Sequence, residues 1–311
     1  MPDMGIEDVA AARVLNGSQP ESPSVGPSYD GVDVRVISAP GLNDAPAVSI
    51  RLMRPTGVSE ALPVLIAMHG GGFVLGQARD FDYFCLEVVR VLGIAVANVE
   101  YRLAPETPFP GPLDDCYAAL EYVHAHGDEL GIDPTRIALG GSSAGGGLAA
   151  GTALRARDEG GPPVAFQFLL SPALDDRLRT FSTTQWADPL VLSRRTGVLA
   201  WQYYLGPGYA GPDDPNVSVY AAPARAADLA GLPPTYIAAM ELDPVRDENI
   251  QYALRLLQAG VSVELHSHPG TFHGSVEMVP AAGSSARIRR GILEALGRGL
   301  HTGTAPSMTS R

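Results

Sequence analysis

Residues 140–147 read Gly140-Gly141-Ser142-Ser143-Ala144-Gly145-Gly146-Gly147 and lie between a predicted strand and a predicted helix. Within this stretch Gly141 and Gly145 flank Ser143 two residues away on either side, which gives the pattern Gly-x-Ser-x-Gly. A serine that projects above a sheet from a sharp strand-to-helix turn needs such neighbours, because the turn is strained and leaves no room for a Cβ. The stretch therefore predicts a nucleophile elbow, with Ser143 as the nucleophile and the two glycines supporting the turn.

The same stretch has two competing interpretations. Gly-x-Ser-x-Gly arises readily by chance in a chain with 35 glycines, and residues 145–150 also fit the Gly-x-Gly-x-x-Ala pattern of dinucleotide-binding folds. That pattern should open a helix and be followed about 20 residues later by an acid. Here the glycines fall inside the predicted helix and no acid follows at that spacing. The strand before Ser143 and the helix after it favour the elbow.

Strand-like and helical segments alternate from Val32 onward, the pattern expected of a mostly parallel sheet with helices on both faces. Two alternating segments, Val32–Ser38 and Ala47–Arg51, predict an antiparallel edge. Denser apolar segments predict further strands, mostly buried and parallel, at Val64–Met68, Ile94–Val99, Arg136–Leu139, Phe166–Leu170, Tyr236–Met240 and Val261–His266. Helices are predicted near Phe81–Leu92, Leu113–His124, Ala144–Arg157, Asn249–Ala259 and Ala286–Arg298. The fold class is therefore α/β, with one doubly wound domain of about eight strands over residues 1–311.

Two segments, residues 1–30 and about 175–224, do not fit this alternation. The second separates two predicted strands and contains Trp186, Trp201, Tyr203 and Tyr204, so it is unlike a plain loop. Open α/β sheets place their sites at the carboxyl edge of the strands. We expect both segments to form a helical cap over that edge. The alternative is an ordinary helical hairpin in the core.

A serine nucleophile requires an oxyanion hole, formed by backbone N–H groups that point to where negative charge develops. The run His69-Gly70-Gly71-Gly72 follows the predicted strand Val64–Met68, where such a loop belongs. Glycines let the backbone approach the substrate closely. The run predicts the oxyanion loop, although a flexible turn would have the same composition.

His273 is the best candidate for the general base among the seven histidines. It lies in Gly270-Thr271-Phe272-His273-Gly274, which we expect to be a loop just past the last strand. The others are His69 in the oxyanion run, His124 and His126 at a helix end, His266 and His268 on the last strand, and His301 in the tail. A metal site formed by Glu264, His266, His268 and His273 is conceivable, but the spacing matches no zinc signature. We therefore expect no metal ion and no cofactor.

Asp243 is the candidate for the acid that orients the base. It follows the predicted strand Tyr236–Met240, where a carboxylate can reach an imidazole from the next strand. The order of serine, acid and histidine then matches one of the known chain orders of catalytic triads. Asp247 is the nearest rival, but Asp247-Glu248-Asn249 opens a predicted helix, and we interpret Asp247 as its N-cap.

Composition excludes several classes of protein. The formal net charge is −12, which disfavours nucleic acid and anionic membrane surfaces as partners. Lysine is absent, so Schiff-base chemistry with pyridoxal phosphate, a Walker A loop and a Ser-x-x-Lys centre are excluded. The two cysteines, Cys85 and Cys116, lie on predicted helices and are expected to be buried thiols. No signal peptide or membrane span is predicted, and a cytoplasmic location is the default expectation.

Taken together, these motifs resemble the bacterial hormone-sensitive-lipase-like carboxylesterases of the α/β-hydrolase fold, over residues 60 to 280. The resemblance rests on His69-Gly70-Gly71-Gly72-Phe73, Tyr101-Arg102-Leu103-Ala104-Pro105-Glu106, the Ser143 elbow, Asp243-Pro244-Val245-Arg246-Asp247 and Phe272-His273-Gly274, in family order. It implies Ser143, Asp243 and His273 as the triad. It also implies the N–H groups of Gly71, Gly72 and Ala144 as oxyanion donors, supported by His69, Gly70, Gly141 and Gly145. In the family the Tyr101–Glu106 motif is structural.

This sequence departs from the family pattern within the elbow. Ser142 stands where the family usually has Asp or Thr, and Gly147 stands where Asn is frequent. Neither change touches the triad, but both leave the subfamily and its substrate preference open. Members often pair through the last strand and helix, so a homodimer is open by analogy alone.

The sequence thus predicts a serine carboxylesterase that hydrolyses small carboxylic esters, of short to medium acyl length, through an acyl-enzyme intermediate. An amidase, a lactonase or an acyltransferase would use the same triad, and the sequence does not separate them. A ligand-binding relative without catalysis is a further alternative, although such relatives tend to lose a triad member. The natural ester, the acyl-chain length and the stereopreference are not encoded in any motif found here.

Overall fold

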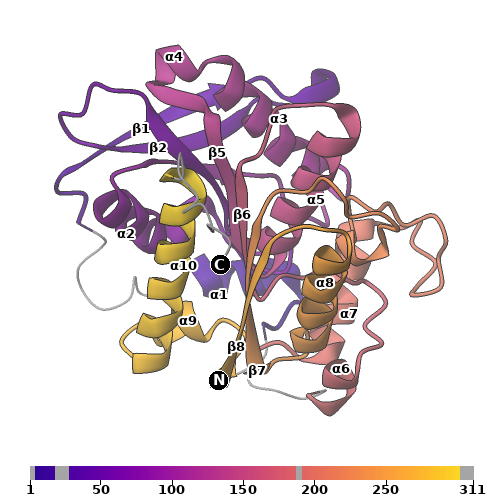
Figure 1. The fold of residues 1–311 in the computed structure, drawn as a ribbon. Helices are drawn as coiled ribbons and strands as arrows, with labels where there is room; N and C mark the ends of the chain where they lie inside the picture. Colours follow the sequence, from indigo (N-terminus) through magenta and orange to yellow (C-terminus); the bar gives the residue numbers. More distant parts are fainter. Residues whose placement is uncertain (1–3, 18–27, 187–190, 302–311) are drawn as a thin grey trace.

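The chain forms one mostly parallel sheet of eight strands in the order β1-β2-β4-β3-β5-β6-β7-β8 (Figure 1). The structure is a computed structural model that describes residues 4–17, 28–186 and 191–301. The strands are β1 (Val32–Ala39), β2 (Val48–Pro55), β3 (Leu62–Met68), β4 (Ala95–Glu100), β5 (Ile132–Ser142), β6 (Phe166–Leu170), β7 (Thr235–Leu242) and β8 (Val263–Phe272). The predicted α/β class and the strand number are confirmed.

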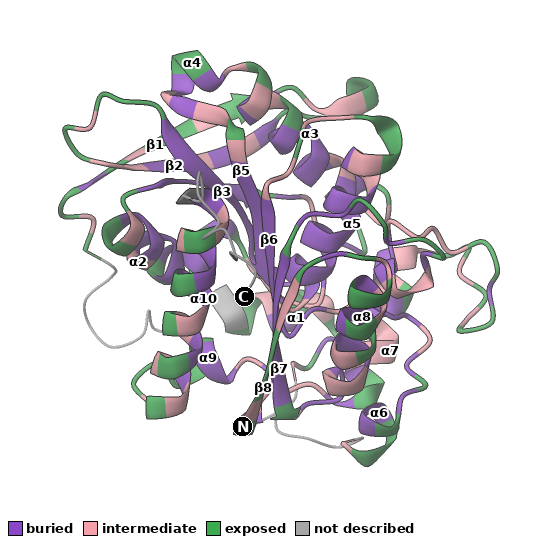
Figure 2. Ribbon diagram, in the orientation of Figure 1, coloured by how far each residue is buried: buried purple, intermediate pink, exposed green. Residues whose placement is uncertain are grey.

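Helices cover both faces of this sheet (Figure 1). The helices are α1 (Val9–Gly17), α2 (Asp82–Leu92), α3 (Gly111–Ala125), α4 (Gly127–Leu130), α5 (Ala144–Glu159), α6 (Phe181–Gln185), α7 (Arg194–Leu205), α8 (Arg246–Gln258), α9 (Ser275–Met278) and α10 (Gly283–His301). Side chains of α2 and α10 form the core with one face, and those of α3, α5 and α8 form it with the other. The central strands are buried on both sides, as Figure 2 shows, which explains their continuous apolar runs.

The antiparallel edge is confirmed. Strand β1 pairs antiparallel with β2, and β2 pairs antiparallel with β4, whereas the pairs from β4 through β8 are parallel. Strand β1 lies at the edge, where Asp33, Arg35, Val36 and Ser38 are exposed to solvent, so its burial alternates except at Val36. Cys85 and Cys116 are free buried thiols in α2 and α3, as predicted.

Strand β8 is longer than its apolar pattern predicts. The predicted strand ends at His266, but β8 continues through Pro269 to Phe272 and pairs with β7 across a register shift between Met240 and Leu242. A proline is tolerated there because β8 is an edge strand, whose outer side needs no backbone donor. His273 therefore follows the strand directly rather than lying within a loop.

Four connections leave the carboxyl ends of β3, β5, β7 and β8 and meet at one edge of the sheet, where the predicted site residues lie. The long connection between β6 and β7 contributes α6 and α7, and α1 lies near the connection after β3. Arg13 of α1 donates hydrogen bonds to the carbonyls of Val74 and Ala104, 2.9 and 2.8 Å away. Within the described residues there is no helix long and apolar enough to cross a membrane.

Candidate active site

Ser143 stands on a strained turn between β5 and α5. Its backbone adopts φ 56° and ψ −118°, a combination that a residue with a side chain rarely takes. The Ser143 N–H donates to the carbonyl of Leu170, 2.8 Å away, which anchors the turn to β6. A Cβ on Gly141 or Gly145 would lie 2.4 or 2.1 Å from the Met68 carbonyl oxygen. The chain can turn this sharply only with glycine on both sides of Ser143.

The structure brings Ser143, His273 and Asp243 into one hydrogen-bonded chain. The Ser143 Oγ lies 2.8 Å from His273 Nε2, and His273 Nδ1 lies 2.8 Å from Asp243 Oδ2. Asp243 is fully buried, and its second oxygen accepts from the Val245 N–H at 3.0 Å. Since Nδ1 faces a carboxylate, the neutral ring carries its proton there and leaves Nε2 free to accept one.

Burial and the Asp243 carboxylate act in opposite directions on His273. Burial alone lowers the pKa of an imidazole, but the charge of Asp243 and its hydrogen bond outweigh this effect, with a further contribution from Glu277. The net result is a His273 pKa raised above its ordinary value. The ring is therefore a stronger base than an isolated histidine.

Asp247, the rival acid, does not reach His273. The prediction that Asp247 caps a helix is also wrong, because α8 already begins at Arg246 and has Val245 at its N-cap. The turn that follows Asp243 leads directly into the helix, with the Arg246 N–H bonded to the Asp243 carbonyl at 3.1 Å. The Asp247 carboxylate instead accepts from the Ser182 N–H at 2.7 Å, which ties α6 to α8.

The run His69–Gly72 lies beside the elbow. A Cβ on Gly70 would lie 3.5 Å from Ser143 Cβ, so this backbone passes close to the serine. Gly71 has φ +125°, and a Cβ there would lie 2.0 Å from the Leu75 carbonyl oxygen. In the part of the chain that the structure describes, the N–H groups of Gly71, Gly72 and Ala144 donate to no protein acceptor. These three donors remain available to a ligand.

His69 is a buried structural residue of this loop. Its ring stacks on Tyr101 with centroids 4.2 Å apart, and the Tyr101 hydroxyl donates to the His69 carbonyl at 2.7 Å. Burial lowers the pKa of His69 to about 4, so the ring is neutral at physiological pH. Through these two contacts Tyr101, which directly follows β4, helps to hold the loop after β3.

The sequence pattern did not reveal Glu277, which lies in α9. The Ser142 hydroxyl donates to Glu277 Oε1 at 2.6 Å, and this bond ties the elbow to the segment that follows His273. The two residues are 135 positions apart, so no local motif could pair them. Ser142, which departs from the family pattern, thus has a carboxylate partner on another element.

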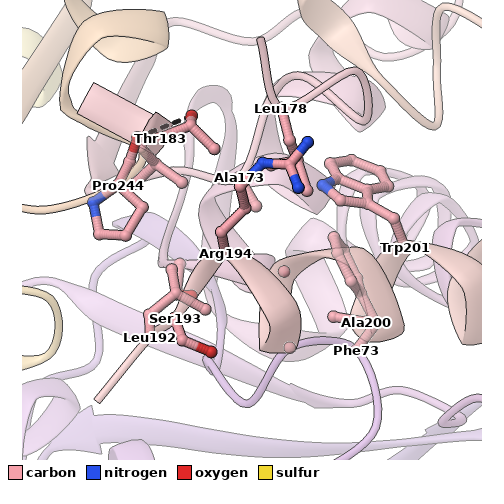
Figure 3. Close-up of a pocket in the computed structure, with 14 residues that line it drawn as sticks. Phe73, Ala173, Leu178, Thr183, Leu192, Ser193, Arg194, Ala200, Trp201 and Pro244 are labelled. Carbon is pink, nitrogen blue, oxygen red and sulfur yellow. Dashed lines mark hydrogen bonds between the residues drawn. The ribbon is translucent and has the colours of Figure 1, made fainter. Parts of the chain in front are cut away.

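A cavity opens above Ser143, between the elbow and the connection from β6 to β7. Figure 3 shows Leu178, Trp201 and Ala200 along it, with the Arg194 guanidinium among them. The full lining is Gly72, Phe73, Ser143, Ala173, Leu178, Thr183, Leu192, Ser193, Arg194, Gly197, Ala200, Trp201, Pro244 and Val245. The walls are mainly apolar, which suits the hydrocarbon part of an ester.

The histidines of β8 are arranged differently from His273. His266 Nε2 lies 2.8 Å from Glu264 Oε1, and Arg298 pairs with the other oxygen of Glu264. Both histidines of the strand stack on each other, with centroids 5.8 Å apart. His273 instead turns inward to Asp243, so the structure does not bring the four residues of the conceivable metal site together. The described ranges also contain no other group of three or more His, Cys, Asp or Glu residues suited to a metal ion.

Comparison with known proteins places this chain in a family. The model of the alpha/beta hydrolase fold family matches residues 65–277. Carboxylesterase NlhH of Mycobacterium tuberculosis (strain CDC 1551 / Oshkosh) is 41% identical over 299 residues, which cover 96% of this chain and 90% of that protein. Esterase LipI of M. tuberculosis (strain ATCC 25618 / H37Rv) is 42% identical over 226 residues, or 71% of this chain and 68% of that one.

Solved structures agree with these relatives. A bacterial heroin esterase superposes with a TM-score of 0.95 at 59% sequence identity and covers 97% of this chain and 95% of its own. Esterase LipW from Mycobacterium marinum superposes with a TM-score of 0.86 at 36% identity, covering 96% and 92%. The chain belongs to the α/β-hydrolase family, in its hormone-sensitive-lipase-like branch of bacterial carboxylesterases. Within that branch it is a carboxylic ester hydrolase.

Proposed function

We propose that Ser143, His273 and Asp243 are the catalytic triad of a serine carboxylesterase that acts through an acyl-enzyme intermediate. The observation that carries this proposal is the unbroken chain of two 2.8 Å contacts from the serine to the buried carboxylate. Ser143 Oγ attacks the ester carbonyl while His273 Nε2 takes its proton. Asp243 keeps the Nδ1 proton in place and stabilises the imidazolium that forms.

The three N–H groups of Gly71, Gly72 and Ala144 are the proposed oxyanion hole. The carbonyl oxygen gains negative charge as the tetrahedral intermediate forms, and donors already fixed by the backbone stabilise it without rearrangement. When the intermediate collapses, His273 returns its proton to the leaving alcohol. Water then attacks the acyl-enzyme with the same histidine as base, and the acid is released.

The cap proposed for residues 1–30 and about 175–224 would set the size of the substrate. Support comes from Leu178, Trp201 and Ala200, which contact the cavity above Ser143, and from Arg13, which ties α1 to the loop after β3. Residues 1–3, 18–27 and 187–190 of these segments lie outside the described residues. The apolar walls of the cavity favour esters with a short to medium acyl chain.

The decisive experiment combines turnover with covalent labelling. The full chain should hydrolyse 4-nitrophenyl acetate, butanoate, hexanoate and decanoate, with a burst of nitrophenol in the first cycle and a maximum at a short or medium length. Diethyl 4-nitrophenyl phosphate should label the protein once, at Ser143 by peptide mapping. His273→Asn should suppress the labelling, whereas the matched change His126→Asn, at the end of α3, should not. Labelling of another residue, or slow binding without turnover, would contradict the proposal.

A further inference from the structure

Arg194 is the one charged side chain among the residues that line the cavity above Ser143. Figure 3 shows its guanidinium between Leu178 and Trp201, at the wall of the cavity. The same side chain also borders a second cavity on the other side of Leu178 and Trp201. Arg194 itself is exposed to solvent, so its guanidinium is hydrated, and its charge borders the cavity at the solvent side.

The described residues supply no counter-charge to Arg194. Most arginines of the described chain pair with a carboxylate, including the neighbouring Arg195 with Glu7 at 3.0 Å and Arg177 with Asp175 at 2.6 Å. Across residues 4–17, 28–186 and 191–301, Arg194 makes no ion pair or hydrogen bond through its guanidinium. Its charge is therefore free to meet a ligand that enters the cavity.

The stability of α7 does not explain this arginine. Arg194 is the first residue of the helix, and the first turn contains no acidic residue. A helix N-terminus favours carboxylates and disfavours cations, by a few tenths of a kcal/mol to about 1 kcal/mol. Arg195 offsets this with Glu7, whereas Arg194 has no such compensation. A guanidinium placed against the preference of its helix, at the wall of the same cavity as Ser143, points to a role in substrate recognition.

We propose that the preferred substrates of this enzyme are esters that carry an ionised carboxylate, which pairs with Arg194 while the ester group lies at Ser143. This inference rests on the proposed function and adds the charge of the substrate to it. The guanidinium fork matches a carboxylate with two parallel hydrogen bonds. The net charge of −12 repels anions from the molecule as a whole, so a preference for them requires a local cation of this kind.

The carboxylate could belong to the acyl half or to the alcohol half of the ester, and two substrate pairs distinguish these cases. The mono-4-nitrophenyl ester of adipic acid carries the anion on the acyl side, and 4-nitrophenyl hexanoate is its neutral counterpart. For the alcohol side, 4-acetoxybenzoate is compared with the neutral 4-acetoxybenzamide. The measured quantity is the ratio of kcat/KM within each pair for the wild-type chain and for Arg194→Gln, with spontaneous hydrolysis subtracted.

We expect the anionic member to be preferred in at least one pair, and Arg194→Gln to lower that ratio by about tenfold, mainly through KM. Arg195→Gln is the matched control, since it removes an adjacent arginine that does not line the cavity, and it should leave the ratio unchanged. Arg194→Lys should restore part of it. Equal ratios in wild type and Arg194→Gln, or no preference in either pair, would overturn the inference while leaving ester hydrolysis intact. If the wild-type chain hydrolyses none of the four esters, both the proposed function and this inference are overturned.

Discussion

The two sides of the proposed active site are built in different ways. On the sheet side, the connections after β3, β5, β7 and β8 hold groups that are buried and hydrogen-bonded, such as Asp243 with both oxygens engaged. On the other side, which we propose to be the cap side, the segment between β6 and β7 presents apolar side chains such as Trp201 and Leu178, together with Arg194, which has no partner among the described residues. The sheet side is fixed by backbone geometry, and the cap side by side-chain packing.

We expect the sheet side to determine the rate of the reaction and the cap side to determine which esters are preferred. A group held at a strand end cannot adjust, so changes on the sheet side should alter the rate for every ester by a similar factor. Side chains of α7 such as Arg194 and Trp201 line the cavity, so changes there should alter the ratio between esters.

The largest loss is expected from Ser143→Ala. Removing the nucleophile should lower kcat by about 10⁴- to 10⁶-fold for all esters, in line with deletions of triad serines. Steady-state turnover across the nitrophenyl series measures this, and an unchanged thermal unfolding transition shows that the fold is retained. A residual rate within tenfold of wild type would mean that Ser143 is not the nucleophile.

Asp243→Asn should produce the next largest loss, about 10³- to 10⁴-fold in kcat, because the imidazole would lose the partner that fixes its tautomer. Asp247→Asn is the matched control, since Asp247 bonds to the Ser182 N–H rather than to the imidazole. We expect it to cost less than about tenfold in kcat. A larger effect of Asp247→Asn than of Asp243→Asn would reverse the assignment of the acid.

Gly145→Ala tests whether the elbow is fixed by the backbone. The added Cβ would lie 2.1 Å from the Met68 carbonyl oxygen and 2.4 Å from that of His69, so backbone on both sides would have to move. We expect a loss of about 3 kcal/mol or more in the free energy of unfolding. Gly260→Ala is the comparison, because its φ is +81° but no atom lies within 4 Å of the added Cβ. Gly260→Ala should lower the free energy of unfolding by about 1–2 kcal/mol. Equal losses by chemical denaturation would show that crowding does not determine the elbow.

The elements of the sheet side were largely predictable from the sequence. The buried parallel strands are mostly continuous apolar runs, and the segments of the antiparallel edge alternate, so the hydrophobic pattern of each segment indicates how far its strand is buried. The length of β8 was not predictable, because Pro269 normally ends a strand and only the edge position permits it. The start of α8 was missed for a similar reason, since the turn after Asp243 has no local N-cap signature.

The contacts that cross between elements could not be predicted. Ser142 and Glu277 meet because α9 lies beside the elbow, and Arg194 and Ser143 line one cavity because α7 borders it. Neither contact can be predicted from a local sequence pattern, because the residues involved are far apart in the sequence. The proposed triad residues, in contrast, lie in short motifs after successive strands, and the topology of the sheet is enough to bring these motifs to one edge.

Ser142→Ala tests the first of these contacts on the sheet side. The change removes the hydrogen bond to Glu277 but keeps the nucleophile and both flanking glycines. We expect kcat to fall by about tenfold or less, because the side chain supports the turn without touching the reacting atoms. Turnover of the same nitrophenyl series gives the answer. A Ser142→Ala enzyme without activity, beside an active Ser143→Ala enzyme, would show that the register of the elbow and the role of Ala144 are both assigned wrongly.

The smallest effect concerns the pH dependence of the reaction. His273 must be neutral to accept the serine proton, and its pKa is raised above the ordinary value of about 6.5. The acidic limb of kcat/KM should therefore lie above that value, with activity lost as the pH falls through it. Glu277 contributes to the raised pKa, so Glu277→Gln should move the limb to lower pH by a few tenths of a unit.

The charge of Glu277 is partly exposed to solvent, so the displacement should shrink in about 0.5 M salt, where screening is strong. Glu264→Gln serves as the control, because Glu264 pairs with His266 and Arg298 and does not act on His273. It should leave the limb in place. A limb that moves to higher pH in Glu277→Gln, or that moves equally in both variants, would mean that the carboxylate beside Ser142 does not act on the base. Glu277 would then be only a structural tie between the elbow and α9.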